Sequence, residues 1–106
     1  KLGLSRQAMY DVVSTSSGQS WSMTTYCPAP GVGPATPADN DYKPGFAADL
    51  MLKDLRLAQE AAASADADTP LGEAAMKLYA KFVEEEDGQG RDFSAMLPRF
   101  EKRGYS

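Results

Sequence analysis

The sequence contains no histidine and one cysteine, Cys27. One cysteine excludes a disulfide framework within the chain, and the lack of histidine argues against a zinc site and against an imidazole-activated thiol. Eleven basic residues stand against 15 acidic ones, which gives a net charge of −4 with no basic stripe. That balance argues against nucleic acid or an anionic membrane as a partner. The apolar runs are far too short to span a bilayer.

What remains is an ordinary globular composition over 106 residues, 42% hydrophobic and 25% charged. This length predicts one small domain, residues 1–106. A core of that size has a thin margin of stability, so pairing with a second chain fits the length. The chain begins Lys-Leu-Gly-Leu without an initiator methionine, and we therefore expect a piece of a longer protein.

The first predicted helix follows Ser5, a candidate N-cap, because apolar residues recur behind it at helical spacing. The serine-rich stretch 14–20 ends this helix, with Gly18 as the expected C′ residue. Residues 21–26 are expected to be a linking stretch.

Three further helices are predicted downstream. The second covers residues 46–63, and the third begins with Thr69 as N-cap and Pro70 at the first helical position. The fourth follows Asp92, a candidate N-cap, and is either kinked or redefined at Pro98. No segment alternates as a strand would. The predicted fold class is all-α, a small helical domain of about four helices with one long proline-rich loop.

That loop separates the first and second predicted helices and runs from residue 27 to residue 45. Five of the seven prolines of the chain lie in it: Pro28, Pro30, Pro34, Pro37 and Pro44. Such density excludes regular helix and interior strand. Loops of this length are usually either functional or disordered, and prolines reduce the entropy lost on ordering. We expect an ordered loop that wraps around the domain.

Lys53 and Asp54 stand side by side in an otherwise apolar part of the second predicted helix. Neighbouring helical positions project about 100° apart, so the two charges cannot serve each other. Two interpretations stay open. Both residues lie at a solvated flank, with Lys53 paired to Asp49 one turn earlier. Alternatively, both point into a cleft, where the ammonium meets an anionic group of a substrate or cofactor and the carboxylate orients it.

Two aromatic residues, Trp21 and Tyr26, precede the proline-rich loop. Core packing accounts for such residues in most small domains. Amphipathic aromatics beside an extended loop also line binding pockets, because a large apolar ring and a polar edge suit a partly wet site. Both interpretations stay open on the residues alone.

Four motifs occur in order along the chain: TSSGQSW at 15–21, YCPAPGVGPATPADNDYKPGFAADLMLKDLRLAQEAA at 26–62, TPLGEAA at 69–75 and DFSAML at 92–97. Together they resemble the C-terminal domain of the 3-hydroxyisobutyrate dehydrogenases, a branch of the β-hydroxyacid dehydrogenase family. The resemblance covers essentially the whole chain. The proline-rich loop is the feature that is similar to this branch rather than to relatives acting on tartronate or succinic semialdehyde.

The resemblance implies a two-domain enzyme in which an N-terminal Rossmann domain binds NAD. The principal catalytic lysine would lie on an interdomain helix, outside this chain. On the present domain, the resemblance assigns Lys53 to cofactor binding near the nicotinamide and Asp54 to support of the active site. It assigns Trp21, Tyr26 and Phe46 to the substrate pocket. It implies no metal.

The activity implied is oxidation of 3-hydroxyisobutyrate to methylmalonate semialdehyde in valine degradation, with the 106-residue chain inactive alone. Its partners would be a small hydroxyacid substrate, its own Rossmann domain and further copies in a homo-oligomer. We expect a cytoplasmic protein in a bacterium, or one of the mitochondrial matrix in a eukaryote. Two alternatives stay open: a stand-alone all-α dimerisation or interaction module, and a dehydrogenase for another small 3-hydroxyacid.

Overall fold

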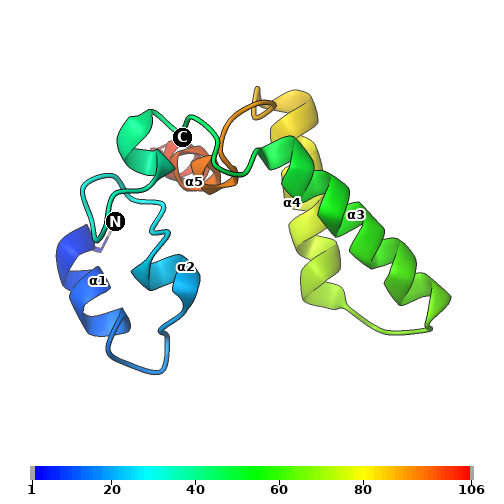
Figure 1. Ribbon diagram of the computed structural model, residues 1–106, viewed down its shortest axis with the longest axis horizontal. Coiled ribbons are helices and arrows are strands. Elements are labelled where there is room, and N and C mark those ends of the chain that lie inside the picture. The colour runs from blue at the N-terminus through cyan, green and yellow to red at the C-terminus, as the bar shows by residue number, and fades with distance from the viewer. Residues whose placement is uncertain (1, 106) are drawn as a thin grey trace.

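The computed structural model describes residues 2–105, and the side chains up to residue 101. This part of the chain contains five α-helices and two 3-10 turns, and no β-strand beyond an isolated antiparallel bridge between Ala47 and Asp92 (Figure 1). The predicted all-α class is confirmed. The elements are α1 (Arg6–Val13), α2 (Trp21–Thr24), η1 (Pro37–Asn40), α3 (Ala48–Ser64), α4 (Pro70–Glu85), η2 (Phe93–Ala95) and α5 (Met96–Tyr105).

Helices α3 and α4 form an antiparallel hairpin that extends to one side of the domain (Figure 1). Both were predicted: α3 begins and ends within two residues of the predicted 46–63, and α4 begins at Pro70 as predicted. Pro70 begins α4, where its missing N–H costs nothing. Thr69 occupies the N-cap position but makes no capping hydrogen bond, and its hydroxyl instead donates to Oε1 of Gln59 on α3, at 3.3 Å. Leu52 and Phe82 are the residues of the hairpin that are most deeply buried besides Ala48.

Helices α1 and α2 lie on the other side of the domain (Figure 1). Ser5 caps α1 as predicted, since its Oγ accepts the Ala8 N–H at 3.1 Å. Residues 21–26, predicted only as a linking stretch, contain a short helix, and the side chain of Ser20 caps it by accepting the Met23 N–H. Gly18 is not a C′ residue, since α1 ends five residues before it.

The proline-rich loop is ordered, as expected, and it also forms part of the core. Asp39 holds it in shape by accepting the N–H groups of Gly31 at 2.6 Å and Thr36 at 2.9 Å. The hydroxyl of Tyr42 crosses the loop to donate to the carbonyl of Pro28 at 2.7 Å. The loop also contains the η1 turn, which its proline density did not predict. Its buried side chains are Cys27, Ala29, Val32, Ala38 and Tyr42.

Two small clusters make up the core, one around Phe82 and Tyr42 and one around Cys27 and Val32. Helix α5 lies between the two sides of the domain (Figure 1). Pro98 stands in its first turn, so the helix is redefined there rather than kinked. The Cα radius of gyration is 15.0 Å, against about 13 Å for a compact domain of this length. The open shape leaves large apolar side chains exposed on α1, α3, α4 and α5. None of the described helices is long and apolar enough to cross a bilayer.

Candidate functional site

Four aromatic side chains form a continuous row where the proline-rich loop meets the starts of α3 and η2. Trp21 stacks on Tyr26 with ring centroids 5.5 Å apart, and Tyr26 stacks on Phe93 at 5.2 Å. Phe93 in turn meets Phe46 edge to face at 5.8 Å. The three residues predicted for the substrate pocket are thus brought together. The fourth, Phe93, was not predicted as a site residue. We call these four residues the aromatic row.

Trp21 forms the open end of the row and is 63% exposed, so it is not a core residue. Its place follows from the Ser20 cap, which starts α2 at Trp21. Gly45 is required at the other wall, because a Cβ there would come within 2.8 Å of the Tyr26 hydroxyl oxygen. A substituent at residue 45 would therefore displace the tyrosine.

Asp92 fixes the aromatic row through hydrogen bonds to Tyr26 and Phe46 and is completely buried. Its Oδ1 accepts the Tyr26 hydroxyl at 2.7 Å and the N–H groups of Gly45 and Phe46, each at 3.0 Å. Its Oδ2 accepts both the N–H and the hydroxyl of Ser94. One carboxylate therefore joins its own turn at Ser94 to two distant segments: Tyr26, 66 residues away in sequence, and Gly45 and Phe46, 47 and 46 residues away. The sequence predicted Asp92 only as an N-cap, a role it also fills.

These contacts set the protonation of the site. Burial acts to raise the pKa of Asp92, but hydrogen bonds from Phe46, Ser94 and Tyr26 outweigh it and hold the pKa below its usual value. Asp92 is therefore ionised near neutral pH. Burial and the bond to Asp92 raise the pKa of Tyr26 to about 12. Tyr26 stays a neutral phenol, so the aromatic row offers shape and apolar contact rather than a proton acceptor.

An apolar hollow of about 280 Å³ adjoins the row beside α5. Tyr26 and Phe93 line it, whereas Trp21 and Phe46 do not. The remaining wall is mostly apolar: Ser22, Pro28, Tyr79, Ser94, Met96, Leu97 and Phe100. Such a lining binds hydrocarbon surface and provides few groups for polar recognition.

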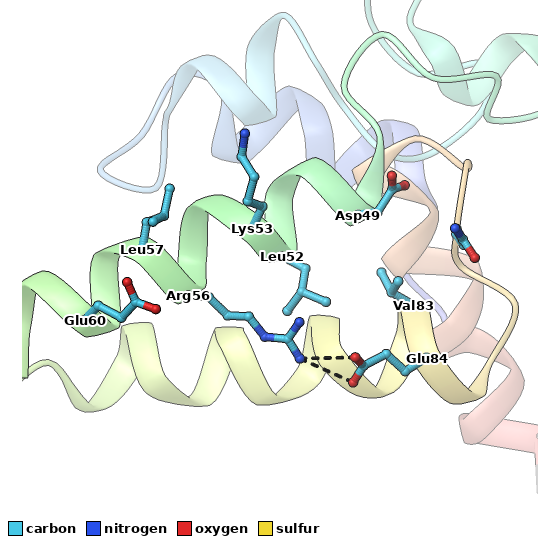
Figure 2. Close-up of a pocket in the computed structure, with 9 residues that line it drawn as sticks. Asp49, Leu52, Lys53, Arg56, Leu57, Glu60, Val83 and Glu84 are labelled. Atoms are coloured by element: carbon cyan, nitrogen blue, oxygen red, sulfur yellow. Dashed lines mark hydrogen bonds and ion pairs between the residues drawn. The ribbon is translucent and has the colours of Figure 1, made fainter.

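A larger, charged groove of about 670 Å³ runs along the α3–α4 hairpin, and Lys53 lines it. Figure 2 shows Arg56 reaching from α3 to Glu84 on α4, with N–O distances of 3.2 and 3.3 Å, while Lys53 points away from α4. The ion pair between Lys53 and Asp49 that the solvated-flank interpretation expected is not formed. Instead, Asp49 accepts the Gly90 N–H at 3.0 Å. The groove residues are Asp49, Leu52, Lys53, Arg56, Leu57, Glu60, Val83, Glu84 and Gln89.

Lys53 and Asp54 are both exposed, and neither forms an ion pair within the described part of the chain. Asp54 is not among the residues that line the groove. The cofactor-binding role predicted for Lys53 stays a prediction. Nothing in the geometry tests the role predicted for Asp54, which stays a prediction. No group of metal-ligating side chains occurs among the described residues.

The described residues thus form a helical domain with an aromatic row and, on a separate groove, an exposed lysine without an ion-pair partner. Comparison with known proteins gives the family. A family model described as "NAD-binding of NADP-dependent 3-hydroxyisobutyrate dehydrogenase" matches residues 1–100. The chain belongs to this family of NAD(P)-dependent dehydrogenases and corresponds to its helical C-terminal domain.

Individual relatives agree with this assignment. A probable 3-hydroxyisobutyrate dehydrogenase of Mycobacterium tuberculosis is 48% identical over 92% of this chain and 32% of its own length. An NAD-dependent L-serine dehydrogenase of Pseudomonas aeruginosa is 40% identical over 93% of this chain and 33% of its own. A solved structure of the M. tuberculosis 3-hydroxyisobutyrate dehydrogenase with L-serine superposes with a TM-score of 0.87 at 45% identity, covering 93% of this chain and 33% of that one. The chain thus spans about a third of the length of the curated relatives it matches.

Proposed function

We propose that this chain is the C-terminal domain of an NAD-dependent 3-hydroxyisobutyrate dehydrogenase, which oxidises 3-hydroxyisobutyrate to methylmalonate semialdehyde in valine degradation. The observation that carries the proposal is the match of nearly the whole chain to this family, at 48% identity to the mycobacterial relative. In this reaction the alcohol carbon loses a hydride and the alcohol oxygen loses a proton. The NAD nicotinamide supplies the hydride acceptor when the cofactor is bound.

The residues of this chain would divide the work by position. Trp21, Tyr26 and Phe46 would line the substrate side of the site, which agrees with their union in the aromatic row. Lys53 would bind an anionic group of the cofactor, because its ammonium is exposed and unpaired within the described residues. Asp54 would support the active site from the next helical position. Asp92 would keep the row rigid, and the proton acceptor would come from outside this chain.

A second candidate substrate is L-serine, which is also a small 3-hydroxyacid. The Pseudomonas relative is an L-serine dehydrogenase, and the superposed mycobacterial structure is described with L-serine. The two substrates differ at the carbon next to the carboxylate, which bears a methyl group in one and an ammonium in the other. The apolar rings of the row and the apolar hollow favour the methyl group.

Turnover by the full-length protein tests both candidates. Each substrate is assayed with NAD and with NADP, and kcat/KM is compared across the four combinations. We expect the highest value for 3-hydroxyisobutyrate with NAD. A higher value for L-serine would assign the second substrate, and no turnover of either substrate would overturn the dehydrogenase assignment for this protein.

The partners proposed are the Rossmann domain of the same protein and further copies in a homo-oligomer. Exposed apolar side chains on α1 and α5 support this, because isolated domains seldom leave so many uncovered. Met9 at 49% and Val12 at 65% lie on α1, Leu4 at 67% lies just before it, and Phe100 at 45% lies on α5. The compartment proposed is the cytoplasm of a bacterium, or the mitochondrial matrix of a eukaryote.

A further inference from the structure

A third cavity, of about 220 Å³, lies where the end of α4 meets α5. Phe82, Glu86, Arg91 and Arg99 line it, and none of the four belongs to the aromatic row or to the Lys53 groove. Two of the four are arginines and one is a carboxylate, so the cavity carries an excess of positive charge. The dehydrogenase proposal assigns it no role.

Arg99 is the unusual member, because its guanidinium is almost completely buried. The residue is 6% exposed, and its side chain 4%. Its Nε donates to the two carboxylate oxygens of Glu86 at 3.0 and 3.2 Å, and Nη2 lies 3.0 Å from Oε1. Nη1 has no hydrogen-bond acceptor within the described part of the chain. Buried charged donors are normally satisfied, so these N–H groups point to an acceptor that the chain itself does not provide.

Arg91 reaches the same cavity from a tightly fixed turn. Gly88 is buried against the Phe82 ring, where a Cβ would lie only 2.5 to 2.7 Å from ring atoms. The Arg91 N–H donates to the Gly88 carbonyl at 3.1 Å, and the Arg91 carbonyl accepts from Ala48 at 2.8 Å. The backbone of Arg91 is therefore held at both ends while its side chain stays exposed and free to turn into the cavity.

We propose that this cavity binds a small inorganic oxyanion of the phosphate or sulfate type between Nη1 of Arg99 and the guanidinium of Arg91. Such an ion offers several acceptor oxygens in the geometry that guanidinium groups bind best. It also offsets the charge that Glu86 leaves uncompensated. Water would satisfy the Nη1 donors but would leave two arginine charges beside the one carboxylate that lines the cavity among the described residues.

Sulfate binding to the full-length protein tests the proposal without reference to its activity. Sulfate is titrated at constant ionic strength, balanced with chloride, while Tm is followed. The variants are Arg91→Gln, Arg91→Lys and Lys77→Gln. Lys77 is the matched control, because it is also an exposed cation but lies on α4 and pairs with Glu73. Any sulfate site elsewhere contributes equally to all the proteins and cancels in the comparison.

We expect sulfate to raise the Tm of the parent and of Lys77→Gln equally. Loss of one charge-assisted contact in Arg91→Gln should weaken the apparent affinity about tenfold or more, with Arg91→Lys between the two. Crystals soaked in selenate should show an anomalous peak between Arg91 and Arg99. An unchanged sulfate response in Arg91→Gln, or a selenate-soaked crystal with only water in the cavity, would each overturn the proposal.

Discussion

Replacing Asp92 by asparagine tests whether one buried carboxylate holds the aromatic row together. Asp92 receives five hydrogen bonds, three on Oδ1 from Tyr26, Gly45 and Phe46 and two on Oδ2 from Ser94. Asparagine has nearly the same volume, so Asp92→Asn creates no cavity. It turns one acceptor oxygen into an NH₂ group and removes the negative charge.

The cost follows from the orientation that the new amide can adopt. With its oxygen in the Oδ1 position, the three contacts to Tyr26, Gly45 and Phe46 survive in weaker, uncharged form. The NH₂ group then faces Ser94. The Ser94 hydroxyl can rotate to accept a hydrogen bond from it, but the backbone N–H of Ser94 is left without an acceptor. One buried unsatisfied donor costs about 1–3 kcal/mol, and charge-assisted bonds lose strength as well. We expect a total destabilisation of about 2–3 kcal/mol.

Residue-level hydrogen exchange of the full-length protein measures this locally. The amide protons of Gly45 and Phe46 donate directly to Asp92, so their protection factors should fall by about 30- to 150-fold, at tenfold per 1.4 kcal/mol. Asp54→Asn is the control, because Asp54 is an exposed carboxylate without an ion-pair partner in the described chain. Protection in Asp92→Asn within about threefold of the parent would refute the reasoning.

The same variant predicts a change in acid stability. The pKa of Asp92 is lowered in the folded state, so its contribution is present above the unfolded pKa of about 4 and is lost as pH falls through the folded value. The parent should therefore lose protection at Gly45 and Phe46 as the solution is acidified below about pH 4. Asp92→Asn should lose less over the same range, and parallel profiles would contradict the assignment.

Four further predictions concern the activity and assembly of the domain. The 106-residue chain alone should show no NAD-linked turnover of 3-hydroxyisobutyrate, because the cofactor domain would be missing; measurable turnover by the purified chain would contradict this. In the full-length enzyme, Lys53→Ala should weaken cofactor or substrate use, and Asp54→Ala should lower kcat. Each change should lower kcat/KM by roughly 10²-fold if the charge lies in a closed cleft. Values of kcat/KM within about threefold of the parent, at unchanged Tm, would show that both residues are ordinary surface charges. Gly45→Ala should raise KM more than it lowers kcat, since its Cβ would lie 2.8 Å from the Tyr26 oxygen and displace that ring; an unchanged KM would exclude Tyr26 from the substrate wall. The isolated chain should self-associate through its exposed apolar faces, and light scattering that shows a strict monomer at high concentration would count against an interface there.

The helical elements could be predicted from local signals. Ser5, Pro70 and Asp92 each stand where a helix begins, because caps and first-turn prolines act on neighbouring backbone groups. The short helix α2 was missed, since four residues are too few to show an apolar period. Its Ser20 cap was the available signal, and that serine stands among several others in the stretch 14–20.

The candidate site was predicted only in part, for a different reason. Trp21, Tyr26 and Phe46 were named through resemblance, and the structure brings them together. Phe93, which joins them, and Asp92, which holds them, were not named as site residues. Asp92 meets Tyr26 across 66 positions of sequence and Phe46 across 46, and no local pattern encodes such pairings. Asp92 also caps η2, and this local role accounts for an aspartate at that position. The sequence therefore gives no sign of its second role, which is to bind Tyr26 and Phe46.

The protonation of the aromatic row limits what this domain can contribute to catalysis. Alcohol oxidation needs a group that accepts a proton near neutral pH. Tyr26 stays protonated because its pKa is about 12, and both oxygens of Asp92 are already occupied by five donors inside the protein. No described residue of the row therefore combines a free acceptor with access to a substrate. The row can shape the substrate pocket and exclude water from it, and the exposed Lys53 can attract an anionic group of the cofactor. The proposed chemistry therefore requires its base from another part of the enzyme. An activity lost in Asp92→Asn but recovered with rising substrate concentration would fit this division of labour, whereas a loss of kcat at unchanged KM would place Asp92 in the chemistry itself.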